Sequence, residues 1–572
     1  MTPKHGMVWL GVMAMLGTTI AAAGPLPYTH VRHDGATDPK TEGWSRNESR
    51  KGTVAEERIE ADPVGGLPAW SIDDDGTAQA PARLSYEFPL PPRDAYRATT
   101  RRWRYSMSLR VVEASRTPNF SICGEVATAT TRYMIRFGAD GKGNTLVSLG
   151  LKGPILTATV PGTGYHRFVM DFDPKAGVGG MVSIFVDDGK TPLVAEYPGE
   201  PGKGVGPRLV WGSNESGSAG HGHYQAVRFS MDVPPAKKLP LPPSRVAVDN
   251  VCAWPNLTVL PDGTITAVIY SLPSHGGGEG DAQCWASEDE GRTWQLRGIP
   301  APHDPGTCRM NVAAGLARNG DLVVLCSGWD KNDMKAPRHQ RIAKSFASRS
   351  SDGGKTWRVS REFPAEKDMS EFIPFGDIIQ GKDKALYVSA YAQTPGSKGY
   401  TYHSYLLRSD DDGHTWRRVG IIAKGHNETA IIQLADGTWL AAARAGHMDL
   451  YASRDNGATW SIITSTSANQ HPGHFLVLKD GRVLLSHGER RAGIEGVGAR
   501  VSTDAAKTWP PVSLPVARAL NSDCGYPSSV QLRDGRIMTA YYAKGTPTHP
   551  KTYHMAVVFW DVDALLRVSE EP

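Results

Sequence analysis

The sequence predicts an all-β protein, a six-bladed β-propeller preceded by a β-sandwich (jelly-roll) domain. Three observations lead to this fold class: a short motif that recurs five times, an apolar hairpin pattern that recurs six times, and a proline-rich segment that precedes both repeats. The 62 Gly and 41 Pro residues of the 572-residue chain also indicate many turns, which favours strands over helical bundles.

Residues 1–23 predict a signal peptide. Lys4 and His5 give a weakly basic start, residues 7–20 are apolar, and the alanines at 21–23 offer a small-residue cleavage site. At roughly 15 residues, the apolar stretch is short for a membrane span. We therefore expect export, to a secreted or periplasmic location, and no integral membrane segment after the signal has been removed.

Residues 24–231 contain strand-like runs that predict a lectin-like β-sandwich domain. In WRYSMSLRVVE (103–113) and TTRYMIRFGAD (130–140), apolar positions alternate, and Gly and Asp mark the turns. The adjacent segments YHRFVMDFDP and VSIFVDDGK resemble laminin-G-like or concanavalin-like jelly-roll modules, which implies a carbohydrate-binding or packing role. A stabilising sandwich without a ligand is the alternative. The three aspartates at 73–75 suit calcium or, as we favour, a solvated turn.

A proline-rich linker, DVPPAKKLPLPPSR, occupies residues 232–245. Proline fixes φ and has no backbone N–H to donate, so this segment resists both helix and sheet. The propeller domain is then expected over residues 246–572.

A motif of the form S-x-D-x-G-x-T-W recurs in the second domain. The copies are SEDEGRTW (287–294), SSDGGKTW (350–357), SDDDGHTW (409–416), SRDNGATW (453–460) and the degenerate STDAAKTW (502–509). The Asp can accept backbone N–H groups within a turn, the Gly can adopt a positive φ, and the Trp can pack between neighbouring sheets. These properties predict a structural turn without a catalytic role.

A hairpin pattern alternates with this motif. Two apolar strands flank an Asp-Gly or similar turn, and the copies lie at 254–270, 310–328, 374–391, 428–444, 474–490 and 526–542. Six such hairpins predict six four-stranded blades around a central channel. The heads of the hairpins then converge at one mouth of the channel, near Trp254, Arg309, Phe372, Glu428, His471 and Tyr526.

Residues 245–565 resemble the sialidase (neuraminidase) superfamily, in which Asp-box (BNR) repeats build a six-bladed propeller. The resemblance implies a glycoside hydrolase, an exo-α-sialidase-like enzyme that removes a terminal acidic sugar by a retaining mechanism. The substrate of that family carries a carboxylate on its anomeric carbon, which arginine forks hold. Because a carboxylate nucleophile would repel this charge, the family uses a tyrosine.

Three positions match the roles of that family. The segment DCGYPSSVQLRDG resembles the nucleophile strand and implies Tyr526 as the nucleophile. The segment HNETAIIQLADGTWLAAAR implies Glu428 as the base for the phenol proton and Arg444 as a carboxylate-binding arginine. Each also has a structural interpretation, as a core aromatic, a solvated carboxylate and a strand-end charge respectively.

Further substrate contacts are expected from Arg491 or its neighbour Arg490, and from Arg309 at its hairpin head. The first arginine of the family, in an Arg-Ile-Pro-like segment, is replaced here by Cys-Ala-Trp-Pro at 252–255. Trp254 in this segment offers a stacking face for a sugar ring.

The residue that protonates the leaving group is expected in the loop SHGGGEGDAQ. His275, Glu279 and Asp281 compete for this role, and the sequence does not fix the register between them. The second glutamate of the family falls on or beside Tyr542.

The composition excludes several classes of partner. The formal net charge is only +4 and no run of five Lys or Arg occurs, which argues against nucleic acid. The six cysteines form no C-x-x-C pair and no Cys/His cluster with zinc spacing. We expect no metal and no cofactor, and a glycan or oligosaccharide as the partner.

Two alternatives stay open. A hydrolase or polysaccharide lyase acting on a uronate-containing or other glycan is motivated by the missing arginine and by His275, His426, His471 and His474 near the predicted mouth. A non-catalytic glycan-binding protein is the second alternative. A Tyr526 hydroxyl within hydrogen-bond reach of Glu428 favours the sialidase-type enzyme over both.

Overall fold

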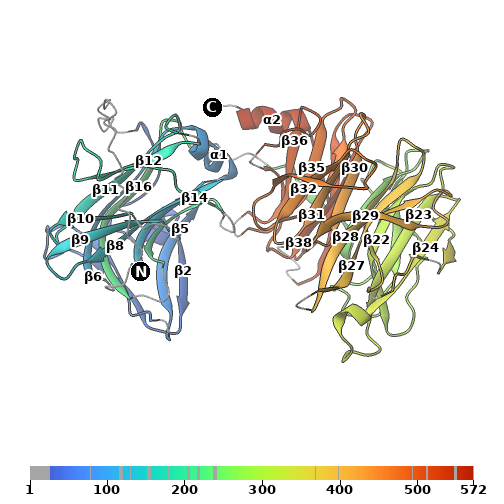
Figure 1. The fold of residues 1–572 in the computed structure, drawn as a ribbon, viewed down its shortest axis with the longest axis horizontal. Coiled ribbons are helices and arrows are strands. Elements are labelled where there is room, and N and C mark those ends of the chain that lie inside the picture. Colours follow the sequence, from blue (N-terminus) through green and yellow to red (C-terminus); the bar gives the residue numbers. More distant parts are fainter. Residues whose placement is uncertain are drawn as a thin grey trace, which may run out of the picture.

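The computed structural model describes residues 26–77, 79–114, 120–128, 130–150, 156–177, 179–202, 206–214, 219–235, 241–361, 363–367, 369–396, 399–491, 494–510, 513–546 and 551–570. The predicted signal peptide lies outside these residues. The described chain is all-β and forms two bodies, coloured blue to green and green to red in Figure 1. We call them the N-terminal domain (residues 28–235) and the repeat domain (residues 244–570).

The N-terminal domain consists of two antiparallel sheets. The first contains, in spatial order, β13 (Val194–Tyr197), β12 (Met181–Val186), β11 (His166–Asp173), β6 (Trp103–Ala114), β16 (Gly220–Met231), β4 (Ala69–Asp74) and β3 (Val54–Ile59), with β1 (Tyr28–His33) also paired to β16. The second contains β10 (Leu156–Pro161), β9 (Asn144–Leu149), β8 (Thr131–Ala139), β7 (Ile122–Ala127), β15 (Arg208–Ser213), β5 (Ala82–Pro89) and β2 (Ser45–Arg50), with β14 (Glu200–Pro201) paired to β8.

The two sheets pack face to face through one aromatic core. Trp103 and Tyr105 of β6 meet Tyr133 of β8 and Trp211 of β15 within a single buried cluster. Tyr105 also donates a hydrogen bond to the Val210 carbonyl across the interface, at 2.8 Å. The alternating apolar positions of these strands therefore face inward, as expected for a sandwich. The helix α1 (Pro92–Thr100) and the short 3-10 helix η1 (Pro39–Glu42) accompany these sheets.

The repeat domain contains six four-stranded antiparallel units. In chain order they are β18 (Cys252–Val259), β19 (Ile265–Tyr270), β20 (Ala282–Ser287), β21 (Gln295–Ala301); β22 (Thr307–Leu316), β23 (Leu322–Asp330), β24 (Ile342–Ser350), β25 (Arg358–Ser360); β26 (Ile373–Gln380), β27 (Leu386–Gly396), β28 (Gly399–Ser409), β29 (Arg417–Lys424); β30 (Thr429–Gln433), β31 (Trp439–Arg444), β32 (Met448–Ser453), β33 (Ser461–Ser465); β34 (Gln470–Val477), β35 (Val483–Glu489), β36 (Gly496–Ser502), β37 (Leu514–Arg518); and β38 (Cys524–Gln531), β39 (Ile537–Lys544), β40 (Tyr553–Trp560), β17 (Ser244–Asp249). The 3-10 helix η2 (Arg338–Gln340) and the C-terminal helix α2 (Val562–Glu570) complete this domain.

The six units close into a ring. The first strand of each unit contacts the first strand of the next, in the order β18, β22, β26, β30, β34, β38 and back to β18. The second and third of these units are also joined by a two-residue parallel pairing of β22 with β26. The sixth unit takes its outer strand, β17, from the beginning of the domain, where β17 pairs with β40. This strand begins at Ser244, two residues before the predicted start of the propeller domain at residue 246, because the proline run ends at Pro243.

The repeated Asp motif forms the turn between the third and fourth strands of five units. In the first copy, Asp289 accepts hydrogen bonds from the Thr293 N–H at 2.8 Å and from the Thr293 hydroxyl at 2.7 Å, and Ser287 donates to Asp289 at 2.8 Å. The same set recurs around Asp352, Asp411, Asp455 and Asp504. Burial works against ionisation of Asp289, yet these donors lower its pKa to about 2. The motif is therefore structural in every copy.

Replacement of Asp289 by Ala is expected to lower the free energy of unfolding by about 1–3 kcal/mol, because two backbone-turn donors lose their acceptor. Since the pKa of Asp289 is lowered from 3.8 to about 2, the carboxylate contributes stability above pH 3.8 that is lost as pH falls towards 2. Urea unfolding should therefore show a large difference in the free energy of unfolding between Asp289→Ala and the wild type at pH 7. Near pH 2 this difference should be small. Glu288→Ala, whose exposed side chain pairs only with Arg297 at the surface, is the control and should change little.

Candidate active site

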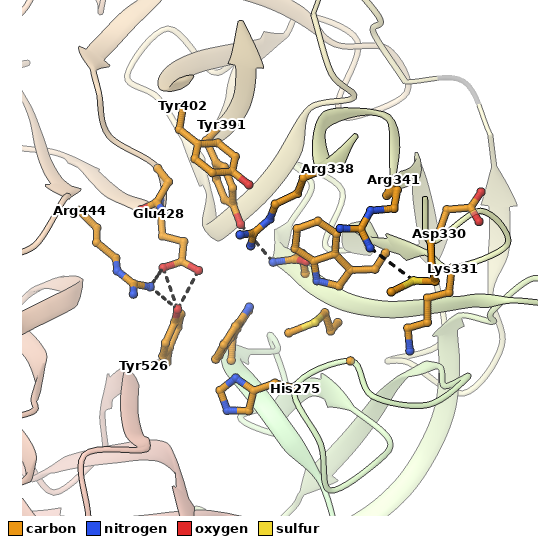
Figure 2. A pocket seen from close by; sticks show the side chains of 17 residues that line it. His275, Asp330, Lys331, Arg338, Arg341, Tyr391, Tyr402, Glu428, Arg444 and Tyr526 are labelled. Atoms are coloured by element: carbon orange, nitrogen blue, oxygen red, sulfur yellow. Dashed lines mark hydrogen bonds and ion pairs between the residues drawn. The ribbon is translucent and has the colours of Figure 1, made fainter. Parts of the chain in front are cut away.

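A cavity of about 480 Å³ lies among the inner strands of the repeat domain (Figure 2). Its lining comes from the first, second, third, fourth and sixth units, and consists of Trp254, His275, Gly276, Met310, Asn311, Trp329, Asp330, Lys331, Met334, Arg338, Arg341, Tyr391, Tyr402, Asn427, Glu428, Arg444 and Tyr526. Aromatic walls and convergent charged groups of this kind are typical of a small-molecule site.

Tyr526, Glu428 and Arg444 form one hydrogen-bonded cluster in this cavity. The Tyr526 hydroxyl lies 2.7 Å from Glu428 Oε1 and 2.8 Å from Oε2, and the Arg444 guanidinium donates to both Glu428 and the Tyr526 oxygen. Burial and the charge of Glu428 raise the pKa of Tyr526 well above its usual value, against the opposing effect of Arg444 and Arg490. The phenol is therefore protonated at rest, and its proton points at a carboxylate that can accept it.

The backbone holds Tyr526 in an unusual conformation. Its φ is +50°, which is uncommon for a residue with a Cβ, and the β38–β39 pairing shifts register between Gly525 and Ser528. A β-carbon at Gly525 would lie 2.9 Å from Gly488 Cα, so only glycine allows the two strands to approach here. The bulge re-aims the tyrosine from the strand ladder into the cavity.

Similar register shifts occur near the start of β18, β22 and β34. They lie at the segments that hold Trp254, Met310 and His471, one in each strand. Four of the six first strands therefore leave their ladder at the cavity end, which frees their side chains to converge.

Trp254 lies directly against the tyrosine. The two rings are stacked with their centroids 3.6 Å apart and an interplanar angle of 10°. The indole N–H of Trp254 is buried without a protein acceptor among the described residues, although the side chain lines the cavity. The segment that lacks the expected arginine thus supplies an aromatic platform and an unused donor.

Arg490 supplies the second positive charge near Tyr526. Its guanidinium lies 5.5 Å from the centre of the Tyr526 ring, compared with 5.8 Å for Arg444. Tyr542, which stands where the resemblance placed a second glutamate, accepts a hydrogen bond from Arg490 at 3.3 Å. Burial, followed by Arg444 and Arg490, lowers the pKa of the neighbouring His471 to about 3, so its ring is neutral at physiological pH.

His275 lines the cavity and is held by a carboxylate. Its Nε2 lies 2.9 Å from Asp523 Oδ1, and its ring packs edge-on against Trp254. Although burial alone would raise the pKa of Asp523, hydrogen bonds from His275, Tyr553 and Tyr542 hold it well below its usual value. A histidine oriented by an ionised aspartate is suited to donate and accept a proton.

Three sequence-predicted residues lie elsewhere. Arg309 is fully buried and donates to Asp304 at 2.7 Å and to the Lys344 carbonyl, while the next residue, Met310, lines the cavity. Arg491 is paired with Glu489 and lines a separate cavity next to Gly206 and Arg208 of the N-terminal domain, so its neighbour Arg490 is the one near Tyr526. Asp281 accepts from the His303 ring and N–H, and does not line the cavity that holds Tyr526.

The other predicted histidines do not line the cavity either. His426 lies 2.9 Å from Asp449, and His474 lies 3.0 Å from Asp377. Of the four histidines considered, His275 alone is part of the cavity wall within the described residues.

Several cavity residues were not predicted from the sequence. Tyr391 and Tyr402 lie near Glu428 (Figure 2). Behind the cavity wall, Asp523 holds His275. Asp330 and the cationic segment 331–341 line the opposite side. The lysines and arginines of that segment, KNDMKAPRHQR, were a compositional signal that a motif search passes over.

No group of three or more His, Cys, Asp or Glu in the described part of the chain has the arrangement of a metal site. The three aspartates at 73–75 include Asp74, which bonds to Ser213 and whose pKa burial raises to about 6. Within the same residues, no helix has the length and apolar character needed to cross a membrane.

Comparison with known families bears on this site. Residues 276–539 match the model of the BNR repeat-like domain. This part of the chain is a BNR repeat-like domain. Its repeats are the Asp turns described above, and its inner strands carry the cavity.

The relatives of this chain include sialidases at low identity. The sialidase of Vibrio cholerae serotype O1 (El Tor Inaba N16961) is 23% identical over 449 residues, 75% of this chain and 50% of the relative, so the chain spans about half its length. The sialidase of Clostridium perfringens is 24% identical over 233 residues, 36% of this chain and 60% of that protein. Among solved structures, a Dyadobacter fermentans protein of unknown function is 23% identical, with 55% of this chain and 99% of that chain covered at a TM-score of 0.46. The Hadza microbial sialidase Hz136 is 15% identical, with 84% and 95% covered at a TM-score of 0.46.

Gly276→Ala is expected to destabilise the His275 loop. Gly276 has a φ of +66°, and a β-carbon there would lie 2.7 Å from Met310 Sδ and 3.0 Å from Cys308 Sγ. The strained backbone costs about 1–2 kcal/mol before any side chain has moved. Denaturant unfolding measures this cost. Gly277→Ala, which meets only the flexible Ser274 side chain, is the control, and equal losses in the two variants would contradict the assignment.

Proposed function

We propose that the chain is a retaining exo-glycosidase of the sialidase type, which removes a terminal acidic sugar from a glycan. In this proposal the ring of six units is a six-bladed β-propeller with the catalytic cavity at one mouth, and the N-terminal sheets form a jelly-roll. The observation that supports the activity most directly is the Tyr526 hydroxyl within 2.7–2.8 Å of both Glu428 oxygens, beside Arg444. The sialidases among the relatives are consistent with this chemistry.

The first step is glycosyl transfer to Tyr526. The phenol oxygen attacks the anomeric carbon while its proton passes to Glu428, and the bond to the leaving oxygen breaks. His275, in its protonated form, donates a proton to that oxygen. Because the tyrosine stays neutral until it attacks, it does not repel a negatively charged sugar.

The second step releases the sugar with retained configuration. His275, now neutral, accepts a proton from a water molecule that attacks the same anomeric carbon. The bond to Tyr526 breaks, and Glu428 returns its proton to the phenolate. Arg444 stabilises the developing negative charge on the Tyr526 oxygen, to which it donates directly.

An acidic sugar suits the positive charge around the reacting centre. Arg444 and Arg490 both approach the Tyr526 ring, so two positive charges lie near the reacting centre although the first arginine of the family is missing. Trp254 occupies the segment of that arginine, and its flat ring and free N–H favour a sugar that stacks and accepts one hydrogen bond. A uronic acid is therefore a second candidate for the terminal sugar.

Tyr526→Phe is expected to reduce turnover of an aryl-sialoside reporter by roughly 10³-fold or more, because the nucleophile is lost. Release of the aryl group by the purified chain measures this. Tyr541→Phe, a buried tyrosine on the neighbouring strand that does not line the cavity, is the matched control and should keep activity. Full activity in Tyr526→Phe would refute the nucleophile assignment. If the wild type releases the aryl group from an aryl uronide but not from the aryl sialoside, the proposed terminal sugar becomes a uronic acid.

His275→Ala is expected to slow substrates with a poor leaving group far more than activated ones. A sugar alcohol needs a proton to depart, whereas a nitrophenolate does not, so the loss should reach roughly 10²–10⁴-fold on an oligosaccharide and stay small on a nitrophenyl glycoside. Asp523→Asn should show the same pattern more weakly, since it leaves the histidine in place. Equal losses of turnover on the oligosaccharide and on the nitrophenyl glycoside would contradict the assignment of His275 as the acid.

The predicted signal peptide adds a cellular location to the proposal. Export would bring the enzyme to glycans outside the cytoplasm. N-terminal sequencing of the exported protein tests this, with Gly24 as the expected first residue.

A further inference from the structure

A cationic arm forms the side of the cavity opposite the reacting cluster. It consists of residues 331–341, between the end of β23 at Asp330 and the start of β24 at Ile342. The arm carries Lys331, Lys335, Arg338 and Arg341 but only one acidic residue, Asp333. Figure 2 shows Lys331 and Arg341 across the cavity from Glu428, Arg444 and Tyr526, and Arg338 extending from the same arm toward Tyr391.

The arm is fastened at both ends to other units. Lys331 Nζ donates to the Gly278 carbonyl at 2.9 Å, which ties it to the loop that carries His275. The His339 ring stacks on Tyr400 of β28, with centroids 3.5 Å apart. The Arg338 guanidinium lies over the Trp329 ring, 4.9 Å from its centre. These contacts hold the positive charges in place before any ligand arrives, which reduces the entropy lost on binding.

The three cavity-lining cations of the arm have no carboxylate partner. Among the described residues, no ion pair joins Lys331, Arg338 or Arg341 to an acidic side chain. Arg341 donates only to the weak acceptor Met334 Sδ at 3.4 Å, and its Nε–H is buried without an acceptor. A buried donor without a partner is costly unless a ligand supplies the acceptor.

A further excess of positive charge lies at the arm end of the cavity, separate from the Arg490 charge beside Tyr526. Arg444 is neutralised by its contact with Glu428. At the arm, one carboxylate, Asp330, lines the cavity beside three cations, and it already accepts from the Asn332 N–H. An excess of two positive charges therefore remains around the arm, away from the atoms that react.

We propose that the arm is a second anion-binding subsite, which holds a carboxylate or sulfate group of the glycan remote from the bond that Tyr526 breaks. This inference rests on the proposed function and narrows its substrate class to glycans with two anionic groups. Arginine forks fit both oxyanions with paired hydrogen bonds. The subsite selects the substrate and takes no part in the proton transfers.

Binding of inorganic sulfate tests the subsite without any need for turnover. Isothermal titration should show sulfate binding to the full chain, weakened about 10-fold or more in the double variant Arg338→Ala/Arg341→Ala. Lys335→Ala removes a cation of the same arm that does not line the cavity, and should bind as the wild type does. Equal sulfate affinity in the wild type and the double variant, with both folded by circular dichroism, would overturn the inference.

Hydrolysis then shows which oxyanion the subsite serves. Sialyl-lactose, its sulfated form and a disialyl oligosaccharide are compared with the aryl sialoside, which has no second anion. The double variant should raise KM for the sulfated substrate if the subsite holds a sulfate, or for the disialyl substrate if it holds a carboxylate. The kcat for these substrates, and both constants for the aryl sialoside, should stay unchanged. Unchanged KM for all of them would overturn the inference. If no substrate is cleaved by the wild type, the proposed function fails, and the sulfate titration still decides the subsite.

Discussion

The pairing of β17 with β40 is the interaction on which the site depends. It joins the beginning of the repeat domain to its end and brings the first unit against the sixth. The stack of Trp254 on Tyr526 and the contact of His275 with Asp523 both cross this seam. The proposed nucleophile and the proposed acid therefore come from opposite ends of the domain and meet only when the ring has closed.

Inside the ring, burial strengthens the interactions among the charged groups around Tyr526. Glu428 is almost wholly buried between Arg444 and Tyr526, where it gains a guanidinium and a phenol in place of water. In such a low-dielectric position the contacts among the three groups act strongly. Burial and the charge of Glu428 keep the proton on the Tyr526 phenol. The same carboxylate outweighs the effect of burial on Arg444 and keeps the charge on its guanidinium.

The sequence predicted the repeat scaffold well because its signals are local. Each Asp turn is complete within eight residues, and each hairpin carries its own turn, so neither depends on distant contacts. Tyr526, Glu428 and Arg444 could be nominated from the sequence because they lie in these same repeated segments. Their meeting within hydrogen-bond distance followed from the convergence of the hairpin heads.

The cavity lining differs from the sequence prediction where one residue of register decides the direction of a side chain. Arg309 and Met310 point to opposite sides of β22, and the bulge in that strand turns Met310 to the cavity. Arg491 and Arg490 differ in the same way beyond β35. Whether His275 or Asp281 lines the cavity depends on the conformation of a loop that is not part of any repeat. The cationic arm likewise lies outside the Asp turns and the hairpins. Such positions are set by tertiary packing, which alternation along a strand does not reveal.

The six cysteines have a consequence for how the protein can mature. All are free thiols buried in the fold, and burial raises the pKa of Cys123, Cys284 and Cys326 to about 12. A thiol of this kind is almost never ionised, so it reacts slowly with oxidants and alkylating agents. Folding to this structure therefore pairs no cysteine with another, and the six side chains act as small apolar residues of the core.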